Sequence, residues 1–88
     1  MQNLFEELVE TVTATIEMEG KINIVYVYGA SSVSNMFVPY ECDFNNCIYI
    51  AGENAVLSLD NIDGMEISFD TDEFQIVIGD ERIFISCL

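Results

Sequence analysis

Carboxylates are the side chains in this sequence with the widest chemical capacity, and they gather in one segment. The segment DNIDGMEISFDTDE, residues 60–73, contains no Lys, Arg or His. Carboxylates can bind a metal ion, transfer protons or contact the Arg side chains of a partner. We identify the six acids of this segment as candidate partner-binding residues: Asp60, Asp63, Glu66, Asp70, Asp72 and Glu73.

The segment matches a metal-binding loop poorly. An EF-hand loop can be aligned with residues 59–70, but its first position then falls on Leu59, which has no ligand oxygen. The chain has no His, and its three Cys lack the paired spacing of a zinc site. We therefore predict no metal and no cofactor. The minor alternative is a loose cation site at Asp70, Asp72 and Glu73.

Catalytic arrangements are also poorly represented. Without a His, the sequence excludes nucleophilic pairs of the Ser-His and Cys-His types. Glu41 and Asp43 would share one face of a strand, which is the usual arrangement of a solvated face. No glycine-rich phosphate loop is present. We predict that the protein is not an enzyme.

The charge balance restricts the partners. Sixteen Asp and Glu stand against Lys21 and Arg82, which gives a net charge of −14. Nucleic acids and anionic membranes are disfavoured as ligands, because binding to them depends largely on Lys and Arg. A basic protein or a cation is the natural partner. The simpler alternative is that the acidity serves only solubility.

The composition indicates one folded domain, residues 1–88. With 51% hydrophobic residues the chain is too apolar for a disordered acidic tail. Its start lacks the basic and apolar regions of a secretory signal, and no apolar run approaches the roughly 20 residues of a membrane helix. An odd number of cysteines without a CxxC motif is typical of free thiols in the cytoplasm. A disulfide between Cys42 and Cys47 is the less favoured alternative.

The N-terminal segment supports two interpretations. Asn3 and Glu6 have the spacing of a capping box, and an apolar stripe continues to Ile16, which favours one helix ending at Gly20. Residues 11–18, TVTATIEM, also alternate strictly, as in a strand. We favour a short helix over residues 3–10 followed by a hairpin. Its pairs would be Glu17–Lys21, Ile16–Ile22, Ala14–Ile24 and Val12–Tyr26.

The rest of the chain predicts strands and turns. Turn signals every 8–12 residues favour an α+β fold, mainly antiparallel β, in which the short helix precedes a six- to seven-stranded small barrel or sandwich. We expect residues 29–35 to form a loop and residues 36–44 an edge strand containing Pro39. Alternation over residues 65–70 directs Met65, Ile67 and Phe69 to the core and Glu66, Ser68 and Asp70 to water.

Three aromatic residues border the expected loop. Aromatic side chains often dominate protein–protein interfaces. We therefore add Tyr28, Phe37 and Tyr40 to the candidate partner-binding residues. The competing interpretation is that each packs in the core.

In size, acidity and lack of catalytic residues, the chain resembles small acidic phage proteins that mimic nucleic acids, namely anti-CRISPR and anti-restriction inhibitors. The resemblance is to a class without a shared motif, so it assigns no residues. It implies a non-enzymatic inhibitor in the cytoplasm of a bacterial host. Such an inhibitor occupies the basic nucleic-acid-binding groove of an enzyme, because Arg recognises carboxylates as it does phosphates.

A structural or assembly module is the alternative. A short helix followed by a bent antiparallel sheet is similar in outline to Sm-like barrels. Open edges at residues 36–44 or at the C-terminal strand could then pair copies into a homodimer or a ring.

Overall fold

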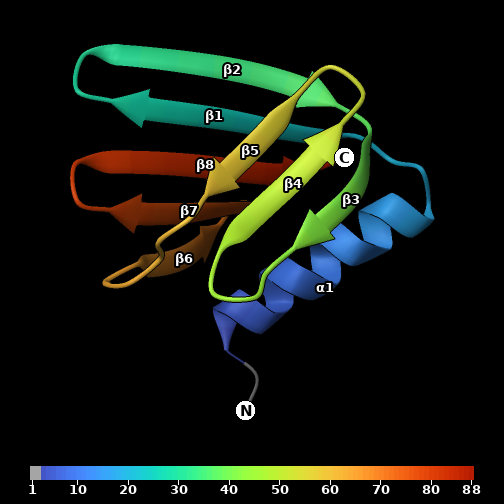
Figure 1. Cartoon of the computed structure of the whole chain (residues 1–88), viewed down its shortest axis with the longest axis horizontal. Helices are drawn as coiled ribbons and strands as arrows, with labels where there is room; N and C mark the ends of the chain where they lie inside the picture. The colour runs from blue at the N-terminus through green and yellow to red at the C-terminus, as the bar shows by residue number, and fades with distance from the viewer. Residues whose placement is uncertain (1–2) are drawn as a thin grey trace.

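The structure, a computed structural model, describes residues 3–88, which form one helix followed by eight strands (Figure 1). The strands make two antiparallel sheets, with orders β2-β1-β8-β7-β6 and β3-β4-β5. The bounds are α1 Leu4–Glu17, β1 Ile22–Tyr28, β2 Ser31–Phe37, β3 Pro39–Asp43, β4 Ile48–Gly52, β5 Val56–Leu59, β6 Glu66–Asp70, β7 Glu73–Ile78 and β8 Glu81–Cys87.

Helix α1 continues well beyond the residue at which we expected it to end. Asn3 caps it by accepting a hydrogen bond from the Glu6 N–H at 2.8 Å, as the capping-box spacing predicts. The hydroxyl of Thr15 donates to the carbonyl of Thr11 at 2.8 Å, so this buried polar group is satisfied inside the helix. Residues 11–17 are therefore helical, and the prediction of a strand there is wrong.

The predicted hairpin between residues 11–17 and β1 does not form, because both strands that pair with β1 come later in the chain. Ile22 pairs with Phe37 of β2 on one side and with Cys87 of β8 on the other. A strand between two neighbours has no free edge for residues 11–17. Those residues contribute more as a helix, whose stripe buries Leu8 and Val12 in the core.

The predicted α+β class with antiparallel strands is confirmed, but the strand count differs. Most of the expected loop at residues 29–35 belongs to β2, which pairs with β1 along its whole length. The expected strand at residues 36–44 divides into the end of β2 and the edge strand β3, which begins at Pro39. Strand β8 lies between β1 and β7, so the C-terminal strand is not an open edge. Within residues 3–88 the two sheets do not close into a barrel.

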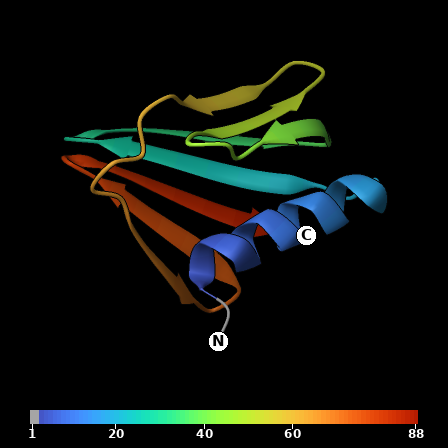
Figure 2. The ribbon, with the colours of Figure 1, turned by 60° about the horizontal axis from the view of Figure 1, so that its bottom comes forward.

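One apolar core joins the three layers. Helix α1 and the three-stranded sheet cover the same face of the five-stranded sheet (Figure 2). The most deeply buried side chains of the five-stranded sheet point to this face. They are Ile22, Ile24, Phe74, Ile76, Ile83 and Ile85, and they meet Leu8 and Val12 of α1 and Ile48, Ile50 and Leu57 of the smaller sheet.

The predicted alternation along β6 is largely confirmed. Met65, just before the strand, and Ile67 are half-buried against the core. Glu66, Ser68 and Asp70 are exposed. Phe69 differs, since it is 47% exposed on an edge strand and packs on Phe74 with ring centroids 4.7 Å apart. In the part of the chain described, the single helix is too short to cross a membrane.

Candidate functional site

The six acids of residues 60–73 divide into two groups at the two ends of β6. The loop between β5 and β6 holds Asp60 and Asp63, and Glu66 begins the strand. The other group surrounds the turn between β6 and β7. Glu66 and Asp70 are four residues apart along the strand, roughly 13 Å at the usual rise per residue. The six acids that gather in one segment of the sequence therefore form two clusters in the structure, one at each end of β6.

Local hydrogen bonds order the first cluster. The N–H of Asp63 donates to Oδ1 of Asn61 at 2.9 Å, and the hydroxyl of Ser58 donates to Asp60 at 3.4 Å. Gly64 completes the turn with a φ of 76°, a conformation that suits glycine. These carboxylates are solvated groups on a structured loop.

The second cluster stands on a tight hairpin. Thr71 and Asp72 have φ values of 53° and 64°, so the two-residue turn is of type I′. The register places Asp70 directly opposite Glu73. The Thr71 hydroxyl donates to Oδ1 of Asp70 at 3.2 Å. The hairpin therefore presents three carboxylates within four consecutive residues.

Helix α1 adds two more carboxylates beside this hairpin. Glu7 and Glu10 line a hollow of about 330 Å³ together with Thr11, Phe69 and Phe74. A second hollow of about 520 Å³ shares Thr11 and the two Phe rings and continues along the hairpin and the last strand. We call these adjoining hollows the acidic groove. Its defining residues are Glu7, Glu10, Asp72 and Glu73 around the rings of Phe69 and Phe74.

The two groove acids on α1 were missed by the sequence analysis. The helical pattern correctly places Glu7 and Glu10 on the solvent side of α1, where acids are usually only solvated. Their role depends on α1 lying beside β6 and β7, and these strands follow more than fifty residues later. No local pattern records such a packing.

An exposed aromatic ring gives the groove an apolar surface. Phe69 lines one hollow together with the helix acids and the other together with the hairpin acids, and its side chain is partly open to solvent. The face of an aromatic ring attracts a cation, and nearby carboxylates strengthen that attraction. The combination is suited to a Lys or Arg side chain that covers the ring and reaches a carboxylate.

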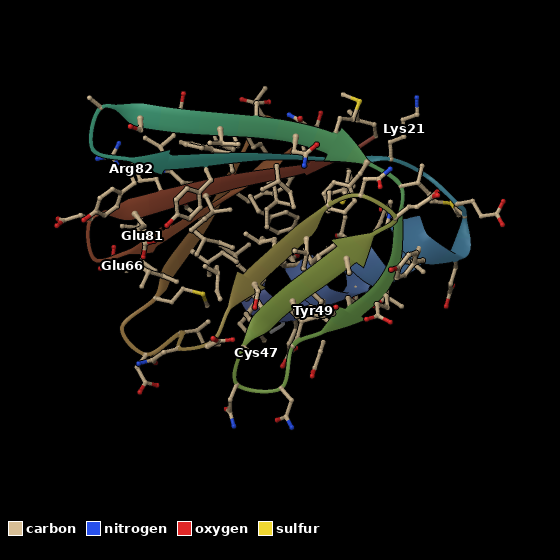
Figure 3. The ribbon with its side chains drawn as sticks, turned by 45° about the horizontal axis from the view of Figure 1, so that its top comes forward. Lys21, Cys47, Tyr49, Glu66, Glu81 and Arg82 are labelled. Atoms are coloured by element: carbon tan, nitrogen blue, oxygen red, sulfur yellow. The ribbon has the colours of Figure 1, made fainter. Side chains whose placement is uncertain are left out.

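Neither cationic residue of the protein lines the groove, although the carbonyl of Lys21 accepts a hydrogen bond from the N–H of Leu88, which lines the second hollow. Lys21 precedes β1, whereas Arg82 pairs with Val27 near the far end of that strand (Figure 3). Neither residue lines either hollow. Over residues 3–88, no group of three or more His, Cys, Asp and Glu is arranged to hold a metal ion.

The aromatic candidates lie apart from the acids. Tyr28 and Tyr40 are exposed, at the end of β1 and in β3. Phe37 ends β2 and packs partly buried against the core. Strand β2 and strand β6 form opposite edges of the five-stranded sheet. The structure therefore does not combine these aromatic residues and the acids into one surface.

The three cysteines are free thiols, so Cys42 and Cys47 do not form a disulfide. Desolvation, followed by the charges of Asp43 and Asp60, raises the pKa of Cys47. Burial raises the pKa of Cys87. A raised pKa keeps a thiol protonated and weakly nucleophilic, so neither of these two cysteines is activated.

The groove can therefore attract and hold positive charge through carboxylates on two segments of backbone, α1 and the β6–β7 hairpin. The chain matches no family model, no curated protein and no solved structure.

Proposed function

We propose that this protein is a non-enzymatic binding module that occupies a basic, nucleic-acid-binding surface of a partner protein. One observation carries the proposal. Carboxylates from α1 and from the β6–β7 hairpin line two adjoining hollows that share the exposed side chain of Phe69, and neither Lys21 nor Arg82 lines the groove. The missing positive charge would be supplied by the partner.

The ordered backbone under these acids supports the idea that a partner's Arg side chains recognise the carboxylates as they would recognise phosphates. Asp72 and Glu73 lie on a tight turn and at a strand start, and Glu7 and Glu10 lie on a capped helix. Such elements fix the backbone positions from which the carboxylates project, as a nucleic-acid strand fixes the spacing of its phosphates. An Arg side chain forms paired hydrogen bonds with either group. The net charge of −14 would also speed association with a basic groove.

The partner class follows from this chemistry. A surface that binds such a module must be rich in Arg and Lys, as the nucleic-acid channels of nucleases are. The class resemblance to phage inhibitors adds CRISPR and restriction nucleases as the first candidates, inside a bacterial cell. Nucleic acid and this protein would then compete for one surface.

The test is an affinity pull-down from a nuclease-treated bacterial lysate with tagged protein, washed at low and then high salt. Three baits are compared. The groove variant carries Asp72→Lys and Glu73→Lys, at two residues that line the groove, and Asp70→Lys, at the residue that pairs with Glu73 across the hairpin. A charge-matched control reverses three exposed acids elsewhere, in the variant Glu17→Lys, Glu53→Lys, Asp80→Lys.

We expect the wild-type protein and the control variant to retain a basic nucleic-acid-binding protein that is released at high salt. We expect the groove variant to lose it, and added DNA or RNA to displace it from the wild-type bait. Equal retention by both triple variants would contradict the groove as the contact surface. If the wild-type bait retained the partner at high salt as well as at low salt, that result would contradict an electrostatic interface.

A further inference from the structure

The edge of the five-stranded sheet opposite the acids has no charge at all. From Ile22 to Tyr40, nineteen consecutive residues include no Asp, Glu, Lys or Arg, although the chain as a whole carries a net charge of −14. This stretch contains β1 and β2. Figure 1 shows β2 along one edge of the sheet and β6 along the other.

Strand β2 presents an unprotected set of backbone hydrogen-bonding groups. It pairs with β1 over seven residues without a register shift, beginning at Tyr28 and Ser31 on either side of the turn. A two-residue hairpin makes that closing pair hydrogen-bonded, and the pairs then alternate. The N–H and C=O groups of Ser32, Ser34 and Met36 therefore point away from β1, toward solvent.

Protected edges carry charges, a proline or a bulge, and β2 has none of these. Strand β6 shows the contrast, since it begins with Glu66 and ends with Asp70. The difference between two edges of one sheet indicates that pairing is blocked at β6 and permitted at β2.

The side chains beside β2 are apolar and open to solvent. Val33 is 65% exposed on β2, and Val56 is 61% exposed on β5. Both line a groove of about 450 Å³ that separates the two sheets, together with Phe37 and Leu59. Glu81 is the single charged residue among the described residues that line this groove. An added strand would extend the sheet and cover these side chains.

We propose that a second copy of this chain occupies this edge, through antiparallel pairing of the two β2 strands. A twofold axis at Ser34 pairs Ser34 with Ser34 and Ser32 with Met36, in both directions. These are the residues whose backbone groups are free, so three hydrogen-bonded pairs form. The axis also brings Val33 of each copy toward the groove of the other.

Charge selects the second copy over other occupants. Two copies of a protein with a net charge of −14 repel each other, so they can approach only through an uncharged surface. Four strand spacings, roughly 19 Å, separate β2 from β6, and physiological salt screens charges beyond about 8 Å. A basic partner would instead be drawn to the acids. Twofold pairing covers the β2 edge of each copy and leaves the two acidic β6 edges at the ends of the combined sheet.

This inference does not depend on the proposed function and is tested without a partner. The full chain is examined by sedimentation equilibrium over a hundredfold range of protein concentration at physiological salt. We expect a mass that rises from one chain to two and no further. Ser34→Pro removes an outward-facing N–H that edge strands can spare, and Ser34→Lys adds a protective charge. Both variants should remain monomeric, with circular dichroism unchanged.

Ser68→Lys is the matched control, because it makes the same substitution on the opposite edge strand. We expect it to dimerise like the wild type. A wild type that stays monomeric, or a mass that grows beyond two chains, would overturn the proposal. So would a dimer that survives Ser34→Lys, since its interface would then lie elsewhere.

Discussion

Asp70 and Glu73 lie directly opposite each other across the turn that joins β6 to β7. Because β6 is an edge strand, Glu73 is the only cross-strand partner of Asp70 among the described residues. Within residues 3–88, no Lys or Arg therefore pairs with Asp70 across the sheet. Like charges in this position destabilise a hairpin, by about 0.2–1 kcal/mol. The hairpin therefore has a charge arrangement that its own folding does not favour.

Reversing one charge of this pair should separate stability from binding. Asp70→Lys replaces a repulsion with an attraction, and we expect the free energy of unfolding to rise by about 0.5–1 kcal/mol. The same change should weaken binding to a basic partner by at least about tenfold, which corresponds to 1.4 kcal/mol. Urea denaturation measures the first effect and titration calorimetry the second. Loss of both stability and binding would show that Asp70 has a folding role instead.

The turn itself offers a second test. Thr71 adopts a φ of 53°, which is unfavourable for a β-branched residue, whereas Asn tolerates it. Thr71→Asn keeps every carboxylate and should raise the free energy of unfolding by about 1 kcal/mol. Thr71→Val, which retains the branching and loses the hydroxyl, is the control and should not stabilise. An unchanged urea midpoint for Thr71→Asn would mean that the turn is not strained.

The sequence predicts this molecule well where structure depends on neighbouring residues. The Asn3 cap, the start of α1 and the alternation of Met65 to Ile67 are local features, and the structure confirms them. Between residues 11 and 17 the sequence pattern fits both a helix and a strand, and the strand that we favoured does not form. What decides is the pairing of β1 with β2 and β8, and β8 lies about sixty residues away.

Part of the candidate site can likewise be predicted from the sequence, and part of it depends on packing between distant segments. The acids of residues 60–73 are visible as a run, and the exposure of Glu66 and Asp70 follows from the strand pattern. Glu7 and Glu10 join them only because α1 packs beside β6. The serine-rich composition of β2 predicts a loop, because strands usually contain more β-branched and aromatic residues. Full-length pairing with β1 overrides that weak preference.

Gly52 provides a prediction that depends on the packing between the two sheets. A Cβ atom built there would lie 2.5 Å from Cδ2 of Phe37 and 2.8 Å from the carbonyl oxygen of Val38. Gly52→Ala should therefore lower the free energy of unfolding by about 1–3 kcal/mol. Ser58→Ala, on the exposed face of the neighbouring strand, should change it by less than about 0.5 kcal/mol.

A double-mutant cycle identifies the clash at Gly52. Phe37→Ala removes the ring, so Gly52→Ala should cost less in that background, with a coupling energy above about 0.5 kcal/mol. Urea denaturation measures the free energy of unfolding of the wild type, the two single variants and the double variant. Strict additivity would mean that the ring of Phe37 does not limit this position.

The phenol of Tyr49 gives a pH-dependent prediction. Its hydroxyl donates to Oε1 of Glu41 at 3.0 Å, and this hydrogen bond is the main reason that the pKa of Tyr49 is raised. The folded pKa then exceeds the unfolded value of about 10, so the stabilisation is present below pH 10 and lost as the pH rises through the folded pKa. Glu41→Gln should lower the pKa of Tyr49 toward its ordinary value.

Ultraviolet absorbance of the phenolate measures that titration. The difference between the wild type and Tyr49→Phe assigns the signal to Tyr49. Glu41→Gln is then compared with Glu66→Gln, which removes an exposed carboxylate on β6, a strand of the other sheet. If both variants titrate like the wild type, the hydrogen bond does not persist in solution.

Salt should stabilise the fold itself. With a net charge of −14, the folded chain repels itself, and salt screens that repulsion. Each 1 kcal/mol recovered would raise Tm by roughly 4–8 °C in a domain of this size. Calorimetry from low to high NaCl measures the rise. The Ser34→Lys background is used throughout, so that dimer formation does not contribute to Tm.

The two triple variants show where the repulsion is concentrated. Each reverses three acids and so changes the net charge by six, from −14 to −8 before the Ser34→Lys change. Asp70, Asp72 and Glu73 lie within four residues, whereas Glu17, Glu53 and Asp80 lie on separate segments. We therefore expect the groove variant to lose more of the salt dependence of Tm than the control. Equal slopes for the two variants would mean that only the net charge matters and that the acidic groove is not a centre of strain.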